Sequence, residues 1–87
     1  MCTHIAESTP IHGMGKGADG WFALTQATVG YDHTTHSAEE HALLIDFANY
    51  DLGVGARVAL ELDLASGKAL LAQLADVIAR AEATGLS

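Results

Sequence analysis

Four segments of the chain have patterns of apolar and polar residues that are typical of β-strands. These segments are residues 2–7, 21–31, 41–50 and 56–63. Residues 21–31 are rich in aromatic and β-branched side chains, which favour extended structure. Segment 41–50 carries apolar side chains at both even and odd positions, a pattern typical of a central strand that is covered on both faces.

A single long helix is expected at residues 64–84. Asp63 fits its N-cap, and Gly85 fits a left-handed stop at its end. At about 1.5 Å per residue the helix spans roughly 30 Å, enough to cover three or four strands. The sequence therefore predicts an α+β fold in a single domain, residues 1–87, with an antiparallel sheet of about four strands and the C-terminal helix packed on one face. The apolar stripe of this helix recurs at helical spacing and consists of Leu70, Leu74, Val77, Ile78 and Ala81.

Glycine, proline and small polar residues mark the expected turns. Residues 8–10 interrupt the first strand, residues 51–55 form a turn, and Gly30 is expected to mark a bulge. Segment 13–20 holds four of the nine glycines and is interpreted as a flexible hairpin connection. The alternative is a nest of backbone amides that binds an anion beside Lys16, although no serine or threonine follows this lysine as a P-loop requires.

The chain is small and acidic. A chain of 87 residues buries roughly 60–65% of its unfolded surface, and domains of this size often gain stability from a metal or a second subunit. Cys2 is the sole cysteine, which excludes an internal disulfide. The net charge of −7 opposes binding to nucleic acid and to an anionic membrane surface. Neither a signal peptide nor a run of about 18 apolar residues is present, and the expected location is the cytoplasm.

One acidic residue, Asp46, falls inside the apolar segment 41–50. A carboxylate within a covered strand needs a partner, because leaving it unpaired in the interior costs several kcal/mol. Arg57 in the next predicted strand is the nearest basic residue by sequence. We therefore expect an ion pair between Asp46 and Arg57 across a hairpin.

Histidines gather just before the third predicted strand. His33, His36 and His41 place three of the five histidines within nine residues, and a loop can fold them toward one point. Three neutral imidazoles with a thiolate or water complete a tetrahedral zinc site, and iron, nickel and manganese are alternatives. The spacing matches neither a zinc finger nor the helical His-Glu-x-x-His arrangement of metalloproteases. The competing interpretation is an exposed loop whose polar residues bind no metal.

The first strand and Glu40 supply the remaining donors of the predicted site. Cys2 and His4 share one face of segment 2–7 under period-two geometry, and this strand can lie beside the histidines in the sheet. Glu40 is either a ligand or a general base that acts on a metal-bound water. The predicted metal ligands are thus His33, His36, His41, Cys2 and His4, with Glu40 as the candidate catalytic residue.

Several short sequence motifs can be recognised along the chain. Met-Cys-Thr opens it, Tyr-Asp-His-x-x-His occupies residues 31–36, Glu-His-Ala-Leu occupies 40–43, and Gly-Ala-Arg-Val-Ala occupies 55–59. This set resembles a family of short bacterial, actinobacterial-type proteins of unknown function. The family has a proline after the Tyr-Asp-His triplet, where this chain has Thr34. The resemblance spans nearly the whole chain and implies no activity, cofactor or site.

Two functions are consistent with the sequence. The first is a small metal-binding protein, in which hydrolytic, lyase or redox chemistry is open. The second is a non-catalytic interaction module, either a homodimer or the small acidic subunit of a larger enzyme. It is motivated by segment 41–50, which is apolar on both faces although a single helix covers one face of the sheet. A metal at a dimer interface would serve both functions.

Overall fold

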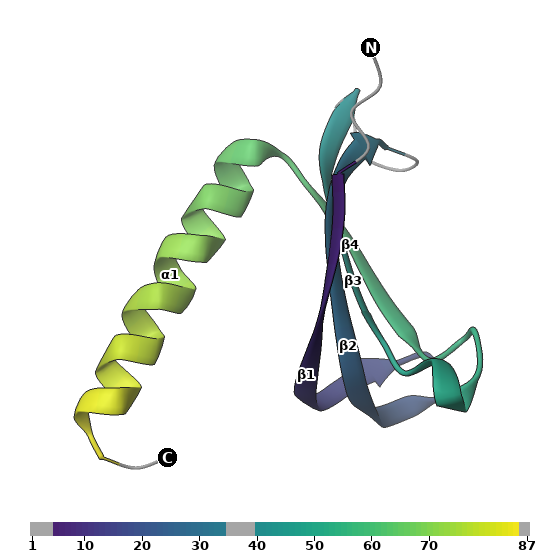
Figure 1. Ribbon diagram of the computed structural model, residues 1–87, viewed down its shortest axis with the longest axis horizontal. Helices are drawn as coiled ribbons and strands as arrows, with labels where there is room; N and C mark the ends of the chain where they lie inside the picture. Colours follow the sequence, from purple (N-terminus) through teal and green to yellow (C-terminus); the bar gives the residue numbers. More distant parts are fainter. Residues whose placement is uncertain (1–4, 35–39, 86–87) are drawn as a thin grey trace.

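The computed structural model describes residues 5–34 and 40–85 and shows a four-stranded sheet followed by one long helix (Figure 1). The sheet is antiparallel throughout, in the order β1-β2-β3-β4. The predicted α+β class, with a C-terminal helix on one face of an antiparallel sheet, is confirmed. The elements in chain order are β1 (Ile5–Gly17), β2 (Gly20–His33), β3 (His41–Ala48), the short 3₁₀ helix η1 (Tyr50–Leu52), β4 (Arg57–Leu62) and α1 (Leu64–Ala83).

Strand β1 is much longer than the sequence suggested. It runs through residues 8–10 and 13–17 and stays paired with β2, with a register shift between Pro10 and Gly13. The predicted break at residues 8–10 was wrong. The hairpin connection predicted over 13–20 is present but shorter, because residues 13–17 belong to β1 and the turn comprises residues 18–19. Pro10 is tolerated since β1 is an edge strand, where a residue without an N–H need not interrupt a ladder on its outer side.

The face of the sheet toward α1 is apolar. Residues paired across antiparallel strands project to the same face, and the register places Val29, Ile45 and Leu60 side by side. A second row, two residues further along, contains Tyr31 and Leu43. The alternation predicted for the strands therefore assembles one continuous apolar surface under the helix.

The opposite face carries the Asp46–Arg57 ion pair. Nη2 of Arg57 lies 2.8 Å from Oδ1 of Asp46, and Nε of Arg57 donates a hydrogen bond to the same oxygen at 2.9 Å. The two residues lie on adjacent strands, β3 and β4, and the predicted pairing is confirmed. The Asp46 side chain keeps 27% of its surface exposed, so the carboxylate is partly hydrated as well as paired.

Gly30 lies where the backbones of β1 and β2 come very close. It pairs with Ala6 and with Leu44 without a register shift, so the predicted bulge was wrong. A Cβ atom at this position would meet the carbonyl oxygen of Ile5 well inside 3.0 Å, a distance that real Cβ atoms essentially never show. Glycine is needed here because a side chain cannot fit between the two strands.

Helix α1 begins and ends as predicted. The Asp63 carboxylate accepts a hydrogen bond from the backbone N–H of Ser66 at 2.7 Å, as an N-cap does. This bond, together with a bond from the Ser66 hydroxyl, holds the pKa of Asp63 below its usual value. At the other end Gly85 has φ +72°, the left-handed conformation that ends many helices.

Helix α1 meets the sheet at its first turns and leaves most of its apolar stripe uncovered. Gly67 lies against the side chain of Leu43 on β3, and from there the helix runs away from the sheet (Figure 1). Leu74, Val77 and Ile78 keep 52%, 51% and 55% of their surface exposed. The helix is therefore placed on the predicted face but is not embedded in it.

Buried side chains are small throughout the part of the chain that the structure describes. The buried hydrophobic residues there are Ala27, Ala42 and Ala48, and no large side chain is fully buried. In a soluble domain, leucine, isoleucine and phenylalanine usually occupy such positions. The described chain thus has little hydrophobic core of its own.

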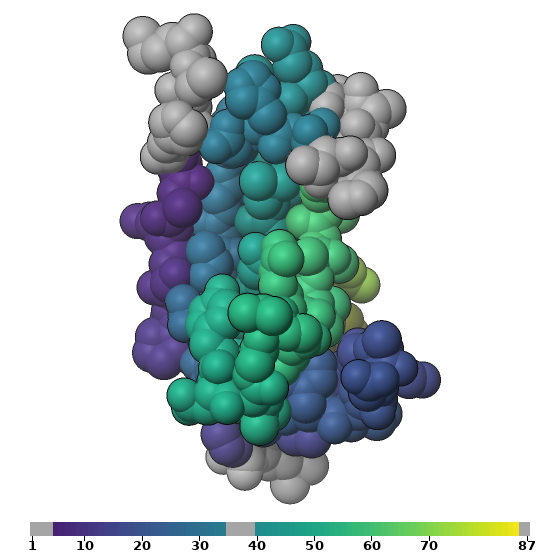
Figure 2. Space-filling view, turned by 90° about the vertical axis from the view of Figure 1, so that its right-hand side faces the viewer, coloured from purple at the N-terminus to yellow at the C-terminus, as the bar shows by residue number. Residues whose placement is uncertain are grey.

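One buried polar residue, Asn49, joins η1 to the sheet. Its amide donates a hydrogen bond to the carbonyl oxygen of Ala23 on β2 at 3.0 Å, and its Oδ1 accepts one from the N–H of Asp51 at 3.1 Å. Close by, the tip of the β1–β2 hairpin bends away from α1 (Figure 1). The tip lies beside the segment between η1 and β4, on the face shown in Figure 2. This bend leaves the face under α1 open.

Candidate metal centre

Two of the predicted metal ligands face each other at one end of the sheet. His33 is the last residue of β2, His41 is the first residue of β3, and the two are register partners. Their ring centres lie 4.4 Å apart, and the ring planes are inclined by 35°. Partners across an antiparallel ladder project to the same face. Strand pairing therefore brings these histidines together, whereas the sequence suggested that loop folding would do so.

The pair has the chemistry of a two-nitrogen chelate. Each neutral imidazole offers one nitrogen lone pair. A zinc ion bound by both rings at Zn–N distances of about 2.0–2.1 Å would hold the ring centres roughly 5 Å apart. The observed separation of 4.4 Å is close to that value. His33 and His41 together carry two nitrogen donors, half the number of ligands in a tetrahedral shell.

Tyr31 forms the third member of this aromatic group. Its ring centre lies 5.8 Å from that of His41, with the planes inclined by 22° in a stacked arrangement. Tyr31 and His33 are two residues apart on β2 and so share a face. The stacking limits the orientations that the His41 ring can take. Sequence reasoning missed this role, although the two-residue spacing between Tyr31 and His33 was the signal that could have shown it.

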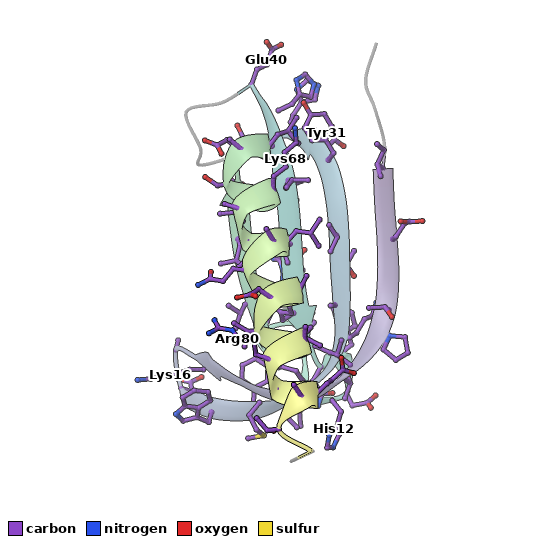
Figure 3. The ribbon with its side chains drawn as sticks, turned by 90° about the vertical axis from the view of Figure 1, so that its left-hand side faces the viewer. His12, Lys16, Tyr31, Glu40, Lys68 and Arg80 are labelled. Carbon is purple, nitrogen blue, oxygen red and sulfur yellow. The ribbon has the colours of Figure 1, made fainter. Side chains whose placement is uncertain are left out.

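Two hydrogen bonds lie beside the histidines at this end of the sheet. The Asp32 carboxylate accepts a bond from the backbone N–H of His33 at 2.7 Å. The N–H of Thr34 donates to the carbonyl oxygen of Glu40 at 3.4 Å. The Thr34–Glu40 bond links the chain at the ends of β2 and β3 beside the histidine pair, whereas the Asp32–His33 bond is local to β2. The side chain of Glu40 is exposed at the same end of the molecule as Tyr31 (Figure 3).

The remaining predicted ligands fall on parts of the chain that the structure does not describe. Cys2, His4 and His36 lie outside the described residues. Within residues 5–34 and 40–85, no three histidine, cysteine, aspartate or glutamate side chains gather in a way that could hold a metal ion. His12 lies at the end of the sheet opposite to Tyr31 and Glu40 (Figure 3).

The glycine-rich segment does not form the anion nest considered from the sequence. Residues 13–17 are extended and paired with β2, and Lys16 lies opposite Trp21 in the ladder. A nest needs successive backbone N–H groups that converge on one point, whereas neighbouring N–H groups of a strand point in opposite directions. The extended conformation therefore contradicts an anion nest over residues 13–17.

The arrangement defines the class of protein: a small α+β domain built from a four-stranded antiparallel meander and a C-terminal helix. No helix in the described part of the chain combines the length and the apolar character needed to cross a bilayer. The whole chain, residues 1–87, matches the family described as "Family of unknown function (DUF6295)", and it belongs to that family. No curated protein and no solved structure shows significant similarity to the chain.

Proposed function

We propose that this protein is a small metal-binding protein whose site is built on His33 and His41. Zinc is the expected ion, with iron, nickel or manganese as alternatives. The supporting observation is the separation of 4.4 Å between two imidazole ring centres on register partners. We further propose Glu40 as a ligand or as a general base on a metal-bound water. The additional ligands proposed from the sequence are His36, Cys2 and His4.

Elemental analysis of protein purified without a histidine tag tests this proposal. We expect close to one equivalent of metal in the wild type and a large loss in both His33→Ala and His41→Ala. His12→Ala is the matched control, because this histidine lies at the opposite end of the sheet (Figure 3). Fewer than about 0.2 equivalents in the wild type, unchanged by either substitution, would remove the proposal.

Glu40 has its own test. If Glu40 is a general base, Glu40→Gln keeps the full metal content and loses any hydrolytic turnover. If it is a ligand, the same substitution lowers the metal content. Glu39→Gln is a control that changes the neighbouring acid, and it should alter neither quantity. Unchanged metal content and unchanged turnover in Glu40→Gln would show that Glu40 has neither role.

A second candidate function is that of a non-catalytic interaction module, as a homodimer or as a subunit of a larger complex. It is favoured by the half-exposed stripe of α1 and by the absence of a fully buried large side chain from the described chain. Exposed apolar patches of this kind mark interaction sites in soluble proteins. Light scattering over a wide concentration range, with a search for co-purifying proteins, tests this function. A lone monomer with no partner and no accessible apolar surface would contradict it.

A further inference from the structure

We infer that the uncovered apolar face of the sheet is occupied by a second copy of this chain, whose α1 lies over the β1–β2 half of the sheet. This inference rests on the proposal of an interaction module and names its partner. The helix layer is narrower than the sheet that it faces. A helix with its side chains is about 10 Å across, whereas four strands spaced about 4.8 Å apart present a face nearly twice as wide. In Figure 3, α1 lies over the side of β3 and β4, and β1 is clear of it.

The uncovered half contains an apolar hollow beside the start of α1. The hollow has a volume of about 420 Å³, and its lining includes Ile5, Val29, Tyr31, Leu43 and Leu64. Most of these residues belong to β1 and β2. The space is large enough for several leucine-sized side chains, such as those on a helix stripe. It therefore suits a second amphipathic helix that packs next to the first.

The exposed apolar area is sufficient for a small dimer interface. Taken together, the residues named below leave on the order of 600 Å² of accessible surface per chain, which is the lower end of the range for a specific, stable protein interface, about 600–1,000 Å² per partner. This exposed surface lies partly on α1 and partly on the sheet, so each copy can pack its helix on the other copy's sheet. The residues are Ile5, Val29, Leu64, Leu70, Leu74, Val77 and Ile78, which are between 37% and 55% exposed.

The connection between β4 and α1 argues against closure by the chain's own helix over β1 and β2. One residue, Asp63, separates Leu62 from Leu64, and its side chain is bonded to the first turn of α1. This short capped link starts α1 at the β4 edge of the sheet. The β1–β2 half must then be covered from another molecule. In a dimer with a two-fold axis, the α1 of each copy covers the β1–β2 half of the other copy's sheet, since such an interface uses the same surface on each subunit.

Paired variants of the full chain test this arrangement by light scattering. The wild type should have a mass of about 18 kDa, twice 9.0 kDa. Leu74→Glu on the stripe and Val29→Glu on the β1–β2 half should each raise the dimer dissociation constant by about tenfold or more. Gln73→Glu and Gln26→Glu place the same side chain on the same elements away from the interface and should leave the dimer intact. Circular dichroism identifies any variant that fails to fold.

A second measurement uses the wild type alone. In a mixture of isotope-labelled and unlabelled chains, filtered NOE spectra should show contacts between the Leu74 and Val29 methyl groups of different copies. A dimer without these contacts would overturn the inference. A monomeric wild type would also overturn the inference. Binding of an apolar dye to that monomer then shows whether its apolar face is accessible. Strong dye binding would leave the face open for a different protein, whereas absence of binding would contradict the interaction module as well.

Discussion

Replacing Gly30 with alanine should destabilise the protein, although alanine is usually the better residue in a strand. The added Cβ meets the carbonyl oxygen of Ile5 well inside 3.0 Å. A backbone atom cannot rotate away as the end of a side chain can, so β1 must move from β2. Overpacking of this kind typically costs about 1–3 kcal/mol, while loss of glycine flexibility returns about 0.5–1 kcal/mol. We expect a net loss of about 1–2 kcal/mol.

Gly13 provides the matched control for this substitution. A Cβ at Gly13 has nothing within 4 Å, and the residue lies on the same hairpin next to the register shift. Gly13→Ala should therefore be neutral or slightly stabilising. The contrast between the two variants isolates the close approach of β1 and β2 from any general effect of removing a glycine.

Thermal unfolding followed by circular dichroism measures the difference. For a domain of this size, each kcal/mol corresponds to roughly 4–8 °C in Tm, so the Gly30→Ala transition should fall clearly below that of the wild type. All samples must have equal protein concentration, because self-association raises apparent stability. If Gly30→Ala melts at or above the Gly13→Ala temperature, β1 does not lie beside β2 in the register described.

Three further predictions concern polar contacts. Hydrogen bonds from Ser66 lower the pKa of Asp63, so the cap should stabilise α1 fully above about pH 4, the pKa of an aspartate in the unfolded chain. This stabilisation should be lost as the pH falls through the lowered pKa of the folded state. The circular dichroism signal of Asp63→Asn at 222 nm should lack this acid transition. A double-mutant cycle of Asp46→Asn and Arg57→Gln should give a coupling of about 0.2–1 kcal/mol that fades in high salt, because the arginine is half exposed. Asn49→Ala should cost about 1–3 kcal/mol in urea unfolding, since it breaks a buried bond to β2, and a loss below the error of the measurement would contradict that role.

The fold was predictable where the sequence pattern and the local chemistry agree. The aromatic and β-branched segment 21–31 falls within β2, and α1 has the expected cap and stop. The error came from β1, where Pro10 and the glycines at 13–17 suggested a break and a loop. An edge strand tolerates both residue types, because one of its sides pairs with no neighbour. Edge position is a tertiary property, so local turn signals could not reveal it.

The candidate site was predictable in part for a similar reason. The sequence showed that His33 and His41 are close along the chain, but their contact depends on the register between β2 and β3. A shift by one residue would place the two rings on opposite faces. The stacking of Tyr31 on His41 depends on the same register. Residue spacing identified the right residues, and strand pairing determined which of them meet.

The irregular edge strand β1 also affects the tendency of the protein to aggregate at high concentration. Pro10 has no N–H donor, and the register shift between Pro10 and Gly13 makes β1 irregular at the edge of the sheet. Sheets with such interrupted borders resist lateral growth into fibrils, since an incoming strand cannot form a continuous ladder. The interrupted edge thus protects the protein from edge-to-edge aggregation independently of what covers the apolar face under α1.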